Sequence, residues 1–276
     1  MPTDSQSPRI LPKQQLSIDA LRLSGSIDSR LGDPDWSFTG EHETAQPGRL
    51  LLAACMRHTA RLLSELDGAD KADFTFAARM VARTLYESLI LAAYLAYFPD
   101  TGYNLVKSNF RAHVGETIVA VKKLNESIAS DAEANGEKRI PPPVTTASLE
   151  GLMKDLGTSS SKLPIELMVR EISAADTQGF FRDNLRRLHL IYRAASLFAP
   201  HTNYWVLKGY FYADTQGALA PTPHSFEGND TLHGDRLFTM HMTACVAILV
   251  LQTEDHPMRD AHDIVDSYQS LVGATY

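Results

Sequence analysis

Apolar positions recur along most of the chain at spacings of three and four residues, which is the period of an α-helix. No segment alternates apolar and polar residues in the way a half-buried strand does. The pattern therefore predicts an all-α fold, a single-domain bundle of about six long helices. The helices expected after residue 46 span 47–68, 70–99, 102–135, 148–157, 164–171, 176–199, 231–252 and 257–272.

Two regions interrupt this period. Residues 202–212 are apolar and aromatic and fit a helix or a strand, and residues 213–230 form a loop long enough to suggest a lid or a disordered excursion. Residues 1–46 are rich in Ser, Asp, Pro and Gly, and only Gln14–Leu23 has a short helical period. We therefore predict a loosely ordered, flexible N-terminal tail over 1–46, with at most one docking helix, and a helical bundle domain over 47–273.

Composition narrows the class of protein. The formal net charge of the 276 residues is -7, which argues for a soluble protein and against charge-driven wrapping of nucleic acid, although a local basic patch stays open. The two cysteines, Cys55 and Cys245, lie in apolar helical patterns and are expected to be small buried hydrophobes. No apolar run reaches the roughly 18–20 residues of a membrane-spanning helix, and no signal peptide is visible. A cytoplasmic location is the simplest expectation.

One predicted helix carries a line of charges although it is otherwise apolar. In AARMVARTLYESLILAAYLA, from Ala77 to Ala96, the residues Arg79, Arg83 and Glu87 fall within about 80° of arc, together with Tyr94. Three interpretations stay open: a stripe exposed to solvent, a buried structural network, or a functional pocket. In a pocket, Arg83 would bind an anion and Glu87 would orient it, because the five donors of an arginine leave some for a second partner.

A second predicted helix has an almost purely basic face. Arg182, Arg186, His189 and Arg193 fall within about 60° of each other, and Ser196 lies at the edge of that arc. One interpretation is a solvated face that is balanced by acids on a neighbouring helix. The other is an anion-binding wall for phosphate, RNA or a carboxylate, since the planar arginine fork matches two oxygens at once.

His201 is the most suggestive single residue. Pro200 is expected to end the second helix, which leaves His201 at its C-terminal end, where the helix dipole favours an imidazolium. Ser196 and Tyr192 lie about one and two turns before it, respectively. If the protein is an enzyme, His201 is the candidate general acid or base, with Ser196 and Tyr192 beside it. The alternative is a histidine that only caps the helix end.

These residues carry a resemblance to known proteins. Through RTLYE (Arg83 to Glu87) and YRAASLFAPH (Tyr192 to His201), residues 47–215 resemble a bacterial family of uncharacterised all-helical proteins, which has no settled activity. RDNLRRLH (Arg182 to His189) and RLFTMH (Arg236 to His241) are more distantly similar to the Arg, polar residue and His signature of helical toxin and defence ribonucleases of prokaryotes. This similarity implies a metal-independent ribonuclease and an RNA phosphodiester as the first substrate to test.

The sequence offers no motif for a cofactor, and we expect none. It lacks the glycine-rich nucleotide loops, the C-x-x-C and H-E-x-x-H metal motifs, and the E-x-x-H pairs of a di-iron bundle. The run TEDHPMRDAHDIVD, from residue 253, gathers acids and histidines, and a metal ion there is a minor alternative to acids placed at a helix start. We expect no metal site.

Two functions remain at this stage. The first is a cytoplasmic helical protein whose polar cluster binds phosphate or RNA and, if it is an enzyme, cleaves RNA. The second is a non-catalytic binding or assembly module in which the cluster is a structural network and exposed helix faces bind a partner or a second copy of the chain. Neither interpretation involves a membrane.

Overall fold

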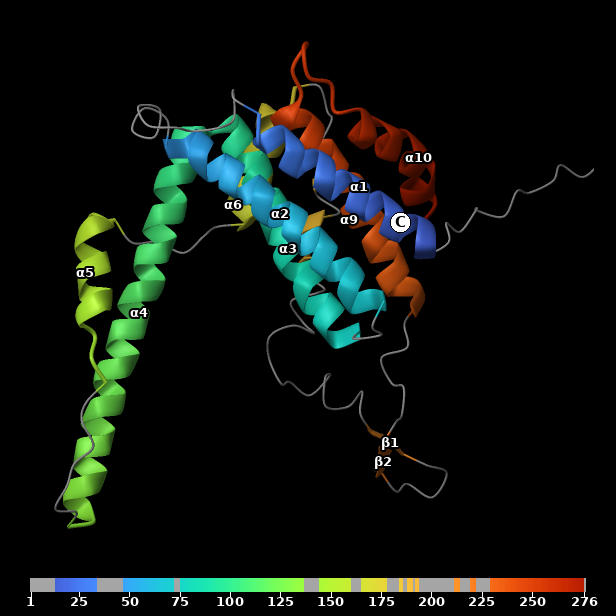
Figure 1. Cartoon of the computed structure of the whole chain (residues 1–276). Helices are drawn as coiled ribbons and strands as arrows, with labels where there is room; N and C mark the ends of the chain where they lie inside the picture. The colour runs from blue at the N-terminus through green and yellow to red at the C-terminus, as the bar shows by residue number, and fades with distance from the viewer. Residues whose placement is uncertain are drawn as a thin grey trace, which may run out of the picture. The chain divides into compact units, whose positions relative to one another are not determined.

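The structure is a computed structural model of the chain. The residues that it describes are 13–33, 47–71, 75–136, 144–159, 165–177, 184, 185, 188–190, 192, 193, 211–213, 219–221 and 229–275. Within them the chain is helical apart from one short pair of strands, so the predicted all-α class is confirmed (Figure 1). Where the sequence predicted a single bundle, the fold has two compact units, Met1–Pro99 with Ile165–Tyr276, and Asp100–Pro164.

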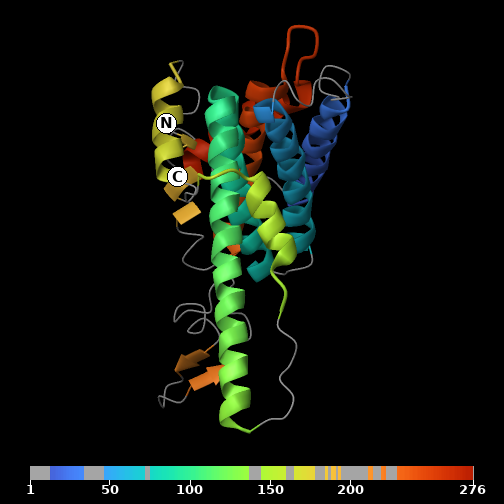
Figure 2. The same ribbon diagram turned by 90° about the vertical axis from the view of Figure 1, so that its left-hand side faces the viewer.

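Four helices form the centre of the first unit. They are α1 (Lys13–Leu31), α2 (Pro47–Lys71), α3 (Thr75–Tyr97) and α9 (Asn229–Leu251), and they lie side by side in both ribbon views (Figures 1 and 2). The helix α10 (Arg259–Thr275) packs on α1 and α9, and α6 (Ile165–Ala175) packs on α3. The core comes largely from α3 and α9, because nearly every side of these two helices is apolar or small.

The helix α1 belongs to this core, although its sequence lies inside the predicted tail. It extends the helix expected at Gln14–Leu23 to Leu31, and it buries an apolar stripe at spacings of four and three. The stripe consists of Leu16, Ala20, Leu23, Ile27 and Leu31. A boundary at residue 46 would therefore leave a core helix outside the bundle.

Polar contacts fix α1 against three neighbouring helices. Ser17 donates a hydrogen bond of 2.5 Å to Asp67 on α2, and Tyr268 on α10 donates one of 2.7 Å to Asp19. Near the other end of α1, Arg30 donates through Nε to the carbonyl of Leu251, the last residue of α9. Each of these polar groups is buried and partnered, so burial costs little compared with an unsatisfied group.

Several helix ends differ from the expected ones. The helix α2 continues past Gly68 to Lys71, and α6 continues to Ala175, so no helix starts at Asp176. In the second unit, α5 (Ala147–Asp155) begins one residue before Ser148, the expected start of this helix. The predicted end of α5 at Gly157 fits the structure, because Gly157 has a φ of +78°, which favours glycine after a helix.

A short antiparallel pair of strands interrupts the helical pattern. It joins β1 (Phe211–Ala213) to β2 (Leu219–Pro221), with Tyr212 opposite Ala220. The region in which helix and strand were both open thus begins a hairpin, and part of the predicted long loop is extended backbone. Three residues per strand are too few for the alternating pattern that marks a strand in a sequence.

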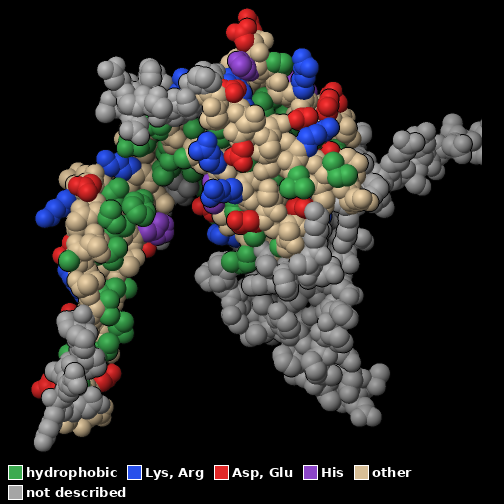
Figure 3. All heavy atoms as spheres, viewed as in Figure 1, with side chains coloured by type: hydrophobic (Ala, Val, Ile, Leu, Met, Phe, Trp, Pro, Cys, Tyr) green, Lys and Arg blue, Asp and Glu red, His purple; other side chains and the backbone are tan. Residues whose placement is uncertain are grey.

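The second unit consists of α4 (Pro99–Ala134), from Asp100 onward, and α5. The segment that contains α5 lies along α4: Lys122 pairs with Glu150 at 3.2 Å, and Arg111 donates to the carbonyl of Met153. Asn125 exchanges two hydrogen bonds of 2.9 Å with the backbone of Val144. Hydrophobic side chains of this unit are visible at the surface in Figure 3. Its exposed large hydrophobic residues include Phe110, Leu124 and Leu152.

The two cysteines fit their prediction. Cys55 and Cys245 are buried and make no disulfide. Burial raises the pKa of the Cys55 thiol to about 11 and that of Cys245 to about 12, so both thiols are neutral at ordinary pH. None of the described helices combines the length and the apolar character needed to cross a bilayer.

Candidate functional site

Two residues of the stripe on α3, Arg83 and Tyr94, contact residues far along the chain. Tyr94, which lies on this stripe, is buried and donates a hydrogen bond of 2.6 Å to Glu171 on α6. Arg83 is half-buried and meets a residue 109 positions further along the chain. Two of the three interpretations thus remain for Arg83 and Tyr94, a structural network or a functional pocket, and a stripe exposed to solvent does not.

One partner of Arg83 among the described residues is Tyr192. The guanidinium lies 5.4 Å from the centre of the Tyr192 ring, and its Nη2 is 3.5 Å from the phenolic oxygen. A guanidinium over an aromatic ring is attracted by the negative face of the π system, which contributes about 0.5–2 kcal/mol depending on burial. The two predicted motifs, RTLYE and YRAASLFAPH, therefore meet in space at their first residues.

A carboxylate from α6 faces the basic residues of the second motif region. One oxygen of Glu166 lies 3.2 Å from Nη1 of Arg193 and 3.7 Å from Nε2 of His189. Glu166 belongs to the first turn of α6, where the helix dipole favours a negative charge. An acid on a neighbouring helix thus balances part of the basic face.

The His189 ring is held against Tyr192. The two ring centres are 6.3 Å apart, and the ring planes are inclined by 30°. Its Nδ1 is buried and has no hydrogen-bond partner among the described residues, whereas Nε2 faces Glu166. His189 therefore interacts with its surroundings through Nε2, the nitrogen that points to the carboxylate.

The buried Tyr94 and the half-buried Tyr97 face α6 and the residue that follows it. Burial raises the pKa of Tyr94 from 10.0 to about 12, and the hydrogen bond and charge of Glu171 act in the same direction. Burial and the nearby charge of Asp176 likewise raise the pKa of Tyr97. The contact between α3 and α6 is therefore polar as well as apolar, and it favours protonated tyrosines.

The Tyr94 contact leads to a prediction about alkaline stability. The folded state holds the pKa of Tyr94 above its unfolded value. The contribution of Tyr94 to the free energy of unfolding is therefore complete below about pH 10, and it is lost as the pH rises toward about 12. Tyr94→Phe should cost about 1.5–3 kcal/mol at neutral pH, as a hydrogen bond to a charged group is lost, and should flatten the alkaline decline. Urea unfolding from pH 8 to 12 measures this. Equal alkaline slopes for the variant and the wild type would contradict it.

The described cluster contains only part of the predicted site. Arg83, Tyr192, His189 and Arg193 lie in it, and Glu87 is described but makes no described contact with them, whereas the remaining predicted residues lie outside the described residues or have undescribed side chains. These are Arg79, whose side chain is not described, and Arg182, Arg186, Ser196 and His201. Arg83 of the first motif and Tyr192 of the second are in contact, whereas the convergence predicted with His201 lies outside the described residues.

The predicted role of Glu87 is not seen. Among the described contacts Glu87 makes no hydrogen bond or ion pair with Arg83, although the two are four residues apart on α3. A pair in which Arg precedes Glu is the weaker orientation on a helix. Among the described residues, Arg83 contacts the Tyr192 ring.

The sequence interpretation missed the two acids of α6. Glu166 and Glu171 lie on a short amphipathic helix, one contacting the second motif region and one contacting α3. A signal was present, because a short helix with acids on two sides precedes the basic face in the sequence. The sequence could not show which helices these acids face.

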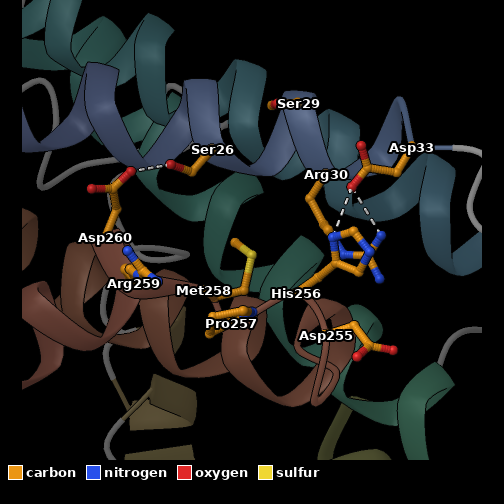
Figure 4. Close-up of a pocket in the computed structure, with 10 residues that line it drawn as sticks. All are labelled: Ser26, Ser29, Arg30, Asp33, Asp255, His256, Pro257, Met258, Arg259 and Asp260. Carbon is orange, nitrogen blue, oxygen red and sulfur yellow. Dashed lines mark hydrogen bonds and ion pairs between the residues drawn. The ribbon is translucent and has the colours of Figure 1, made fainter.

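A separate pocket lies between α1 and the turn that joins α9 to α10 (Figure 4). Its volume is about 360 Å³. Asp33 accepts a hydrogen bond of 3.0 Å from Arg30 and lies 3.7 Å from Nδ1 of His256. On the other side, Ser26 donates to Asp260. The charges that line this pocket are largely paired with one another, which makes it a polar junction between helices.

The run of acids and histidines around this turn does not form a metal centre in the described part of the chain. His256 faces Asp33, and Nε2 of His262 lies 2.5 Å from the amide oxygen of Gln252. No group of three or more His, Cys, Asp or Glu side chains among the described residues is arranged to hold a metal ion. On the face shown in Figure 3, acidic and basic side chains of the described residues are interspersed.

Comparison with known proteins does not assign this chain to a family. Neither a protein-family model, nor a curated protein, nor a solved structure matches this chain. The geometry of the cluster formed by Arg83, Tyr192, His189, Arg193 and Glu166 is therefore the basis for a functional proposal. We call these five residues the Arg83 cluster.

Proposed function

We propose that the protein binds a phosphate-bearing ligand, with RNA as the first candidate, at the Arg83 cluster. The observation that carries this proposal is the meeting of Arg83 with Tyr192 across 109 positions of sequence. The fork of an arginine that is stacked on a ring is preorganised to meet two phosphate oxygens. Arg193 and His189 add two further groups that can donate to an anion.

The net charge of the chain is compatible with a local site. A charge of -7 opposes non-specific binding of a long nucleic acid, so affinity must come from a few directed contacts. The distant similarity of RDNLRRLH to helical toxin and defence ribonucleases is the reason to test RNA before other phosphates. If the protein is an enzyme, His201 acts as the general acid or base of a metal-independent cleavage, with Ser196 and Tyr192 beside it.

Arg83→Ala should weaken the binding of a single-stranded RNA oligonucleotide by about ten- to a hundredfold, because a charge-assisted contact is lost. Arg83→Lys should fall in between, since it keeps the charge but loses the fork. Fluorescence anisotropy at low and at moderate salt measures this, with circular dichroism to show that the variants fold. The matched control is Arg57→Ala, which removes an exposed arginine of α2.

His201→Ala separates catalysis from binding. It should keep RNA binding and abolish cleavage if the protein is a ribonuclease. Unchanged RNA affinity in a folded Arg83→Ala variant would overturn the proposal, whatever the result for His201.

A second candidate function is a non-catalytic binding or assembly module. It is favoured by Glu166, whose carboxylate already balances both Arg193 and His189, and by the bond from Tyr94 to Glu171. In this case the Arg83 cluster is a structural network. Arg83→Ala would then lower the melting temperature, and His201→Ala would change nothing.

A further inference from the structure

The carboxylate of Glu166 lies where the ligand of the Arg83 cluster would place a negative group. We propose that Glu166 is an internal competitor, which occupies the anion position of the cluster and is displaced by a phosphate of the ligand. The proposal rests on the proposed function and adds a regulatory element to that same site. It predicts that the wild-type chain binds anions more weakly than a chain without this carboxylate.

The convergence of two side chains on one oxygen supports this proposal. Arg193 and His189 both approach Oε1 of Glu166, at 3.2 and 3.7 Å, although Glu166 comes from another element 23 to 27 residues earlier in the chain. One oxygen that faces an arginine and an imidazole nitrogen has the surroundings of a bound phosphate oxygen. The first turn of α6 adds the positive end of a helix dipole.

The Glu166 side chain can turn away from Arg193 and His189 into solvent at little cost. It is 73% exposed and Arg193 is 66% exposed, and an exposed ion pair of this kind contributes little to stability. The helix α6 is held independently, through the bond from Tyr94 to Glu171 and through its buried face of Met168, Val169 and Ile172. Rotation of the Glu166 side chain alone would open the anion position, without movement of the helix.

The two basic residues that contact Glu166 differ in how far they are buried, since His189 is much less exposed than Arg193. The His189 side chain is 16% exposed and its ring lies against Tyr192, so its Nε2 stays in place when Glu166 turns away. The same Tyr192 holds Arg83. An incoming phosphate therefore meets an imidazole that is held in place, and among the described residues it competes with the carboxylate of Glu166 for that imidazole and for Arg193.

Glu166→Gln tests the proposal, because it keeps the size of the side chain and removes its charge. It should tighten the binding of a labelled single-stranded RNA oligonucleotide, and of inorganic phosphate, by roughly two- to fivefold at low salt. Glu150→Gln is the matched control. Glu150 also lies in the first turn of a short helix, is exposed and pairs with a cation at 3.2 Å, but it belongs to the other unit. The control should leave both affinities unchanged.

A double variant shows whether the gain passes through the cluster. In an Arg193→Ala background, Glu166→Gln should tighten binding less than it does in the wild type, because one partner of the carboxylate is gone. If the wild type binds RNA through Arg83 but Glu166→Gln binds no more tightly than Glu150→Gln, the competitor role is overturned and the proposed function stands. If neither the wild type nor Glu166→Gln binds RNA or phosphate, both proposals fail.

Discussion

Replacement of Arg236 by Met is expected to lower the free energy of unfolding by about 3–5 kcal/mol, because it leaves a buried carboxylate without its cation. Nη2 of Arg236, on α9, lies 2.7 Å from Oδ1 of Asp67, on α2. Ser17, on α1, donates to the same oxygen at 2.5 Å. The two charged side chains are 4% and 5% exposed, so water cannot replace the lost donor.

The effect of Arg236→Met can be separated from a general loss of surface charge. Arg57→Met removes an arginine that is 55% exposed and lies 3.9 Å from Asp28, and it should cost less than about 1 kcal/mol. A second substitution, Asp67→Leu, should recover much of the loss in Arg236→Met, since no buried charge then remains. Urea denaturation of the wild type and the three variants measures these differences. Equal losses in Arg236→Met and Arg57→Met would contradict the buried network.

The second large effect is expected at Gly48, near the start of α2. A Cβ atom at this position would stand 2.5 Å from the carbonyl oxygen of Pro99 and 2.6 Å from its carbonyl carbon. Both atoms belong to the backbone, which cannot rotate away as the end of a side chain can. Gly48→Ala should therefore lower the free energy of unfolding by about 1–3 kcal/mol, in spite of the higher helix propensity of alanine.

The same helix contains a control of opposite sign. A Cβ at Gly68 would meet no atom within 4 Å, so Gly68→Ala should raise stability by about 0.5–1 kcal/mol through helix propensity. Thermal and urea unfolding should show a lower stability than the wild type for Gly48→Ala and a higher one for Gly68→Ala. A gain at both positions would show that α2 does not approach Pro99 as closely as the structure has it.

The helix α1 is buried in the core, although the sequence pattern predicted a loosely ordered tail there. Serines and aspartates in this segment suggested a loose tail, because such residues are usually exposed. In the fold Ser17, Asp19, Ser24 and Arg30 are buried, since each finds a partner on another helix. A local sequence pattern does not show a partner that lies far away in the chain. The composition of α1 therefore indicated that the helix carries polar residues, but not that they are buried.

For the candidate site, too, some features follow from residue spacing and others depend on contacts between helices. The position of Arg83 and Tyr192 on separate helical faces follows from residue spacing, and their meeting was predicted as an inward turn of two stripes. The expected pair of Arg83 with Glu87 was a local inference and is not among the described contacts, whereas Arg83 contacts the aromatic ring of Tyr192. Glu166 entered the cluster from a helix to which the sequence interpretation gave no role.

By itself, the sequence determined the all-helical class, most helix positions and the burial of both cysteines. It could do so because helical periodicity, proline and glycine positions and apolar runs act over a few residues. Only the tertiary structure decided that α1 is a core helix, that residues 100–164 form their own unit, and that Glu166 faces Arg193 and His189. These features depend on contacts between residues far apart in the chain, and the energy of such contacts depends on which faces of the helices meet.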